Sequence, residues 1–522
     1  MDVEELFIFA QLSRFPPLTS IPLIYKSYKA AVQRNRRCTQ LKSRLRSFLI
    51  PRRAYWPYRD RLMKLNFFRK TALDTTNRKI FRAAMIVGSL GLLARFAAAI
   101  KELLVAQSFG RGDEVDAFLI AFALPSFVLN IGMSALGFAL VPVFVETRQK
   151  QGIEAAQRLF SSMMLLGCIA MVAVAVLLGL LSPIFLPLLG HGFSHTKLEL
   201  TRELLYSLLP WIIFSGIASL AASVLNASEK FALPALIPLL TPLVTIYLVL
   251  FKANHWGIFT LACGAAVGSL LEAMLLLRLL RGQGMRFSLR WHGFDARVRS
   301  VLSQYIPMLT GTILMGSTAV VDQSMTAMLS SGSVAALGYA NKVIGGTLSV
   351  GALALSTATL PYFSKMVAAN DFAGCRHTLK RYSLLVVSVT VPFTLLIITF
   401  SRPIVRVLFQ RGAFTAVDTQ LVSRVQICYA IQIPFYVCSM LFVRFIAAIR
   451  RNDVLMYVSA INLFLDVVLN FSLMRVWHVA GIALSTSIVY IVSFLMISVW
   501  SVRYLAQERL ASLPVAQVEA TH

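Results

Sequence analysis

The sequence has few charged residues and none of the common motifs of enzymes. Only 14% of its 522 residues are charged and 57% are apolar, whereas soluble domains average about 25% and about 45–50%. It contains no G-x-x-x-x-G-K-[ST], H-E-x-x-H or G-x-S-x-G motif, which excludes the familiar ATP-hydrolysing, zinc-protease and serine-hydrolase centres. The six cysteines show no C-x-x-C or Cys/His spacing. We therefore expect free thiols, no metal bound by cysteine and no enzymatic activity.

Long apolar runs dominate the chain from Arg82 almost to its end. Runs of more than 18 apolar residues are long enough to cross a bilayer as helices, and too many recur here to be buried core helices. We predict an all-α polytopic membrane protein with twelve spans: 83–107, 116–145, 159–188, 204–227, 232–252, 256–280, 299–329, 333–363, 382–401, 419–447, 454–475 and 479–503.

Acidic residues are scarce, with 23 Asp/Glu against 50 Lys/Arg and a net charge of +27. Residues 1–82 alone hold 19 Lys/Arg and 5 Asp/Glu, interleaved with aromatic residues. This pattern suits the face of an anionic membrane rather than a nucleic acid, although a poorly ordered tail or a later start near Met63 or Met85 stays open. Most of the remaining basic residues lie in segments on the same side as this arm. The positive-inside rule then places both termini in the cytoplasm.

An internal repeat divides the spans into two halves. The segments VPVFVETRQKQGIEAAQRLFSS (141–162) and LPYFSKMVAANDFAGCRHTLKRYS (360–383) share a pattern of span end, basic loop and amphipathic helix. Two six-helix units with the same orientation are typical of transporters with a central cleft. We predict a basic cytoplasmic arm, an N-terminal lobe, a basic linker, a C-terminal lobe and a cytoplasmic tail, at 1–82, 83–281, 282–298, 299–503 and 504–522.

Three cations lie deep within spans of the two lobes. Arg95 and Lys101 are on span one and Lys342 is on span eight. Charges at this depth are costly and are functional candidates by default. Because Arg and Lys replace water around phosphate, three such cations facing a cleft indicate an anionic substrate. Alternatively, Arg95 pairs with Glu102, while Asp116 and Asp322 neutralise Lys101 and Lys342.

Intramembrane acids and amides form a second candidate site. Asn462 and Asp466 are four residues apart and so share a helical face, and Asp322 lies in the outer half of span seven. Their oxygens suit a hard cation. Sodium or proton coupling is one interpretation, and hydrogen bonding or ion pairing of Asp466 across helices is the other.

Three ordered motifs resemble the MurJ/MviN flippases of the multidrug/oligosaccharidyl-lipid/polysaccharide exporter superfamily. They are LLARFAAAIKELLVAQSFGRGDEVDAFLIAFALPSFVLNIGMSALGFALVPVFVE (92–146), SGSVAALGYANKV (331–343) followed by LPYFSK (360–365), and LFQRGAFTAVDT (408–419). The resemblance spans about 85–500. It implies a V-shaped, two-lobed helical fold in the bacterial inner membrane that exports lipid-linked cell-wall precursors by alternating access.

The resemblance also assigns roles to single residues. It implies substrate contacts with a diphosphate head group for Arg95, Lys101, Asp116, Asn341 and Lys342, the last two standing where the family usually has Asp-Arg. It implies a sodium site at Asp322, Asn462 and Asp466. No other cofactor is implied.

Two departures from the family keep the substrate open. FVLNIGMSALGF replaces a helix-two segment that carries paired arginines in the family, and two C-terminal helices of the family have no counterpart. We expect a flippase for an undecaprenyl-diphosphate-linked saccharide, either lipid II or an exopolysaccharide repeat unit. Membrane lipids and cell-wall or polysaccharide synthases are its expected partners. The alternative is a cation-coupled multidrug antiporter of the same superfamily, in which acidic rather than basic cavity residues are expected.

Overall fold

A computed structural model describes residues 88–228, 230 and 232–511, and every described element is a helix, a turn or a loop. The predicted basic arm at 1–82 and the last part of the predicted tail lie outside the described residues. The first described helix covers 88–109. The helices that follow are α4 (Asp113–Leu189), α5 (His195–Ala227), α6 (Ala232–Leu236), η1 (Ile237–Leu239), α7 (Leu240–Trp256), α8 (Phe259–Arg281), α9 (Ala296–Ala327), α10 (Ser333–Ala368), α11 (Phe372–Thr399), α12 (Ser401–Phe409), α13 (Ala416–Ala430), α14 (Gln432–Ala448) and α15 (Asn452–Ala511).

Two of these helices are too long to be single spans. α4 has 77 residues, which at about 1.5 Å per residue would exceed a hydrocarbon core of about 30 Å several times over. It turns back at Gly152 (φ 85°), a backbone conformation that glycine adopts without steric cost. α15 turns at His478 (φ 50°). Seven of the described helices have the length and composition of a membrane span. Once α4 and α15 are divided, the described part of each of the twelve predicted spans lies mostly in helix.

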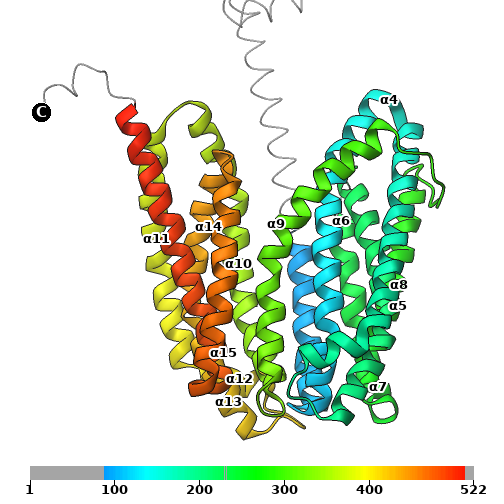
Figure 1. The fold of residues 1–522 in the computed structure, drawn as a ribbon, viewed down its shortest axis with the longest axis vertical. Coiled ribbons are helices and arrows are strands. Elements are labelled where there is room, and N and C mark those ends of the chain that lie inside the picture. Colours follow the sequence, from blue (N-terminus) through cyan, green and yellow to red (C-terminus); the bar gives the residue numbers. More distant parts are fainter. Residues whose placement is uncertain (1–87, 229, 231, 512–522) are drawn as a thin grey trace, which may run out of the picture. The chain divides into compact units, whose positions relative to one another are not determined.

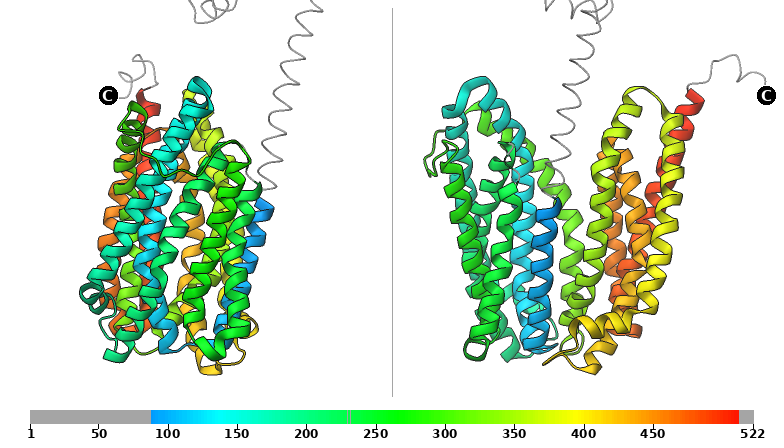
Figure 2. Two further views of the ribbon diagram at one scale, coloured as in Figure 1. Left: turned by 90° about the vertical axis from the view of Figure 1, so that its right-hand side faces the viewer. Right: turned by 180° about the vertical axis from the view of Figure 1, so that it is seen from behind.

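The helices form two bundles (Figures 1 and 2). In the first bundle α4 packs on α5, α5 on α8 and α7 on α8, with the helix 88–109 beside α4. In the second bundle α10, α11, α13 and α15 surround α14. α9 packs against both α4 and α15. The ribbons of the two bundles approach at one end and diverge toward the other. The predicted division into two lobes stays a prediction, since α9 contacts both bundles.

The linker between α8 and α9 is fixed to the first bundle by its backbone. Gln157 of α4 exchanges two hydrogen bonds with the backbone of Arg286, at 2.6 and 2.8 Å. Ser161 bonds the backbone of Ser288 and Arg290. Because these α4 side chains are one helical turn apart, they hold the linker along one face of α4.

Candidate functional site

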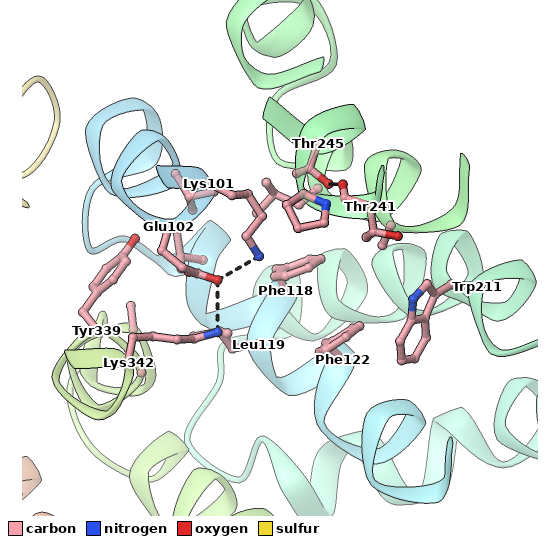
Figure 3. Close-up of a pocket in the computed structure, with 17 residues that line it drawn as sticks. Lys101, Glu102, Phe118, Leu119, Phe122, Trp211, Thr241, Thr245, Tyr339 and Lys342 are labelled. Atoms are coloured by element: carbon pink, nitrogen blue, oxygen red, sulfur yellow. Dashed lines mark hydrogen bonds and ion pairs between the residues drawn. The ribbon is translucent and has the colours of Figure 1, made fainter. Parts of the chain in front are cut away.

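Two lysines and a glutamate from different bundles form a cation cluster. The Glu102 carboxylate accepts from the Lys101 ammonium at 2.8 Å and from the Lys342 ammonium at 3.0 Å. Lys101 and Glu102 belong to the helix 88–109, and Lys342 belongs to α10 (Figure 3). One carboxylate thus faces two ammonium groups, so the cluster keeps a net positive charge. The Lys342 side chain is 53% exposed, against 17% for Glu102, which leaves this cation accessible to a ligand.

The cation cluster lies at one side of a cavity of about 210 Å³. The far side belongs to the first bundle and carries three aromatic and two hydroxyl side chains: Phe118, Phe122, Trp211, Thr241 and Thr245. We call these five residues the aromatic pocket. Within it the ring centroids of Phe122 and Trp211 lie 4.6 Å apart, and those of Phe118 and Phe122 lie 5.8 Å apart.

The structure brings together some of the predicted substrate residues and not others. Lys101 and Lys342 meet at Glu102. The alternative hypothesis had expected Glu102 to pair with Arg95. Arg95 is exposed on the helix 88–109, and Asn341 is exposed beside Lys342 on α10. Neither lines the cavity, and their contact with a substrate stays a prediction.

Asp116 lies elsewhere, in a buried contact between the bundles. Its side chain is 1% exposed and accepts three hydrogen bonds: from the Lys197 ammonium at 2.9 Å and from the backbone N–H groups of Gly332 and Ala335, each at 2.7 Å. Gly332 and Ala335 form the start of α10, which has no capping side chain of its own. Asp116 therefore caps a helix of the other bundle, because a carboxylate stabilises the positive end of a helix dipole.

Further contacts join the bundles around Asp116. The guanidinium of Arg111 donates to Asp418 at 2.8 Å and to the carbonyl of Ser331 at 3.1 Å. The Ala413 N–H donates to the Gln107 carbonyl at 2.8 Å. We call the contact of 107–116 with 331–335 and 411–418 the outer latch, because the positive-inside rule places these loops outside.

A glycine permits the closest approach in the outer latch. Gly412 has φ +56°, and a Cβ atom there would lie 2.3 Å from the Gln107 carbonyl oxygen. Gly412 and Asp418 belong to LFQRGAFTAVDT, a motif that carries the family resemblance but for which no function was predicted. Its glycine and its Thr415–Asp418 capping box were the available signals for a tight, ordered loop.

The acids of the predicted cation site lie between α9 and α15. Asp322 accepts from the Asn470 amide at 2.7 Å and from the Thr486 hydroxyl at 3.1 Å. Asp466 interacts directly with Asp322, and both are buried, 1% and 7% exposed. Among the described residues, no lysine or arginine pairs with either acid. We call Asp322 and Asp466 the acidic pair.

The amide beside the acidic pair is Asn470 rather than Asn462. The Asn462 amide donates to Ser493 at 3.1 Å, whereas Asn470 is fully buried and bonds Asp322. Asp466 Oδ2 and Asn470 Oδ1 have no hydrogen-bond partner among the described residues. Such oxygen atoms fit a hard cation. Asn470 follows Asp466 by four residues, the same signal that had selected Asn462.

Comparison with known proteins agrees with the fold. Residues 105–513 match the family model for the lipid II flippase MurJ. The probable lipid II flippase MurJ of Buchnera aphidicola subsp. Acyrthosiphon pisum is 25% identical over 446 residues, covering 83% of this chain and 85% of the relative. The lipid II flippase MurJ of Burkholderia cenocepacia is 26% identical, over 67% and 70% of the two chains.

Solved structures share the architecture. A lipid II flippase MurJ in an inward closed conformation superposes with a TM-score of 0.69 at 24% identity, over 82% of this chain and 93% of that one. An inward-facing multidrug resistance MATE family transporter reaches 0.68 at 13% identity, over 82% and 100%. The fold is that of a multi-pass membrane transporter, and the matched residues cover most of the chain. The protein belongs to the MurJ lipid II flippase family.

Proposed function

We propose that this protein moves an undecaprenyl-diphosphate-linked saccharide across the bacterial cytoplasmic membrane by alternating access. The observation that carries the proposal is the cation cluster, in which Lys101 and Lys342 share the single carboxylate of Glu102. No covalent step is needed. Lipid II is the substrate named for the MurJ relatives, and an exopolysaccharide repeat unit carries the same diphosphate.

The charge balance of the cation cluster suits a diphosphate. A diphosphate brings about two negative charges, and charge-assisted hydrogen bonds to it are roughly twice as strong as neutral ones. On binding, it would engage both ammonium groups in competition with Glu102. Because Lys101 and Lys342 belong to different bundles, the ligand would also draw the bundles together.

The outer latch sets the direction from which a substrate enters. It joins the bundles at the end assigned to the outside, and the ribbons diverge toward the cytoplasmic end (Figure 2). Loading from the cytoplasm and release after the latch opens follow from this arrangement. An inside-negative potential favours outward movement of each negative charge by about 2.3 kcal/mol per 100 mV, so export needs no ATP.

The acidic pair supports coupling to a cation. Two buried carboxyl groups in direct contact repel each other unless a proton or a metal ion compensates. Asp322, Asp466, Asn470 and Thr486 would hold a sodium ion, which would supply positive charge between α9 and α15. A proton shared by the two acids is the alternative. Either would bias the return of the empty protein to its loading state.

The acidic pair is also the feature that favours the rival function, a cation-coupled multidrug antiporter. Such a protein would bind a cationic drug beside acids in its cavity. The cavity observed here instead carries two lysines and one glutamate. We therefore place the antiporter second. Cell-wall or polysaccharide synthases are the proposed partners that use the exported lipid.

Translocation in reconstituted vesicles tests the proposal. Lipid II and a lipid-linked exopolysaccharide unit are supplied in parallel to the wild type, Arg95→Ala, Lys342→Ala and the control Lys150→Ala. The Lys150 side chain is 71% exposed and pairs with Glu146. We expect Lys342→Ala to lose movement of one lipid while Lys150→Ala keeps it; Arg95→Ala asks whether Arg95 also contacts the substrate. Normal transport by Lys342→Ala, or movement of a cationic drug in place of both lipids, would contradict the proposal.

A further inference from the structure

The aromatic pocket forms the far side of the cavity that also contains the cation cluster. Its residues come from three helices of the first bundle: Phe118 and Phe122 from α4, Trp211 from α5, and Thr241 and Thr245 from α7. Figure 3 shows the three aromatic side chains on one side of the cavity, with the lysines and Glu102 on the other. A ligand held by Lys101 and Lys342 therefore has this compartment directly next to it.

The wall carrying the threonines is held close to α8. Gly264 and Gly268 of α8 face Thr245 and Thr241, and a Cβ atom at Gly268 would lie 2.5 Å from the Thr241 Cα atom. Small residues four apart permit such close helix contacts in membranes. α7 cannot approach α8 further, so the pocket does not close by that movement.

The carboxylate of Glu272 bonds the wall that carries Thr241 and Thr245, at a point where the helical span is interrupted. α6, η1 and α7 form one span interrupted by Pro238 and Pro242, which lack an N–H group and so weaken the helix. Glu272 of α8, one turn beyond Gly268, accepts from the Thr241 N–H at 3.1 Å. Glu272 thus positions Thr241 in the pocket wall.

The chemistry of the pocket matches one sugar ring. A pyranose has an apolar C–H face and a rim of hydroxyl groups, and ligand pockets combine apolar walls with a few placed polar groups. Here Phe122 and Trp211 offer aromatic faces, the indole offers an N–H donor, and Thr245 offers a hydroxyl oxygen. The Thr245 hydroxyl donates to the Thr241 carbonyl at 2.8 Å, which leaves its oxygen able to accept.

Size and position exclude the other parts of a lipid-linked saccharide. The whole cavity, cation cluster included, has a volume of about 210 Å³, below the about 300–1,000 Å³ of pockets for drug-sized ligands, and the aromatic pocket is only a part of it. A polyprenyl chain or a sugar with an attached peptide is far larger. The five residues of the pocket also lie on α4, α5 and α7, three helices of one bundle, whereas a polyprenyl chain must remain in the bilayer.

We propose that the aromatic pocket binds the sugar ring attached directly to the diphosphate, while the cation cluster binds the diphosphate itself. The inference rests on the proposed function and adds a determinant of substrate choice. Lys101 and Lys342 recognise any polyprenyl diphosphate. Phe122, Trp211 and Thr245 distinguish a lipid that carries a sugar from one that does not.

Binding of two lipids to the full-length protein in nanodiscs tests the proposal. The probes are undecaprenyl diphosphate and the same lipid carrying a single pyranose, and the variants are Phe122→Leu, Trp211→Leu, Thr245→Val and Lys342→Ala. The control is Phe251→Leu, at an exposed position of α7 outside the pocket. Thermal melting verifies that each variant is folded, and Thr245→Val removes one hydroxyl with little change of shape.

We expect the wild type and Phe251→Leu to bind the sugar-bearing lipid about tenfold or more tightly than the sugar-free one. Phe122→Leu and Trp211→Leu should lose this preference without weaker binding of the sugar-free lipid, and Thr245→Val should reduce the preference. Lys342→Ala should weaken both lipids. Equal binding of both lipids to the wild type, or equal loss of both in Trp211→Leu, would overturn the sugar site while leaving the proposed function intact. Failure of the wild type to bind either lipid would overturn both.

Discussion

The outer latch and the cation cluster both join residues within 101–116 to α10 or the loop before it, yet their charges are arranged differently. In the latch, Asp116 is buried and receives three donors, including Lys197. In the cluster, Glu102 alone faces two partly exposed lysines. A satisfied acid holds two surfaces together, whereas an under-compensated pair of cations has capacity for an added anion. The same residue types thus make a structural contact at one site and the proposed ligand site at the other.

Removing the cations should have the largest effect. We expect the double variant Lys101→Ala/Lys342→Ala to reduce lipid translocation by about a hundredfold or more, since each charged hydrogen bond to the diphosphate is worth about 1.5–3 kcal/mol. Initial rates in reconstituted vesicles measure this.

Glu102→Gln tests whether the two lysines of the cation cluster are under-compensated, in contrast to the satisfied acid of the outer latch. It removes the internal competitor and should tighten binding of undecaprenyl diphosphate, measured as the dissociation constant in nanodiscs. Weaker binding in Glu102→Gln would mean that the carboxylate orients the lysines rather than competing with the substrate.

Opening the latch should have the next largest effect. Asp116→Asn keeps the size of the side chain but removes its negative charge, which both the Lys197 ammonium and the start of α10 contact. We expect the bundles to separate more often at the outer end and translocation to fall by about tenfold. Spin-label distances between the loops near 111 and 411 report the separation. Glu146→Gln, at an exposed carboxylate, is the matched control, and unchanged distances in Asp116→Asn would remove the latch from the mechanism.

The acidic pair is a third charged site, and we ask whether it binds an ion, as proposed for the cation cluster, or is a purely structural contact like the outer latch. We expect sodium chloride, compared with choline chloride, to raise the melting temperature of the wild type, because a ligand that binds only the folded state stabilises it by mass action. Asp466→Asn should abolish this rise. If the wild type melts at one temperature in both salts, a sodium ion is not the coupling ion and a shared proton takes its place.

A smaller effect is expected where the latch depends on backbone shape alone. Gly412→Ala places a Cβ atom against the Gln107 carbonyl at a positive φ, which costs about 1–3 kcal/mol. The outer distances should widen less than in Asp116→Asn. Gly293→Ala, also at positive φ but with open space around it, separates strain from collision and should leave the distances unchanged.

The spans and the meeting of Lys101 with Lys342 could be predicted from the sequence, because apolar run length and depth along a helix follow directly from residue order. The partners could not. Glu102 lies seven residues after Arg95 and so on its face, yet its bonds go to a neighbour and to a residue 240 positions away. The same i, i+4 spacing suits Asn462 and Asn470 equally, and only packing against α9 decides between them. The resemblance assigned Asp116 to the substrate, and the sequence does not show that its carboxylate bonds the start of α10.

The attachment of the α8–α9 linker to α4 has a mechanical consequence. Gln157 and Ser161 hold the linker to the first bundle, so the beginning of α9 must travel with that bundle. The other end of α9 is tied to the second bundle, where Asp322 bonds Asn470 and Thr486 of α15. Any rocking of one bundle against the other must therefore bend α9 along its length, and Pro307, which lies inside this helix, is a residue type at which helices bend. Because both of its ends are fixed, α9 would store elastic strain when it bends. A cation at the acidic pair would strengthen the attachment of its second end.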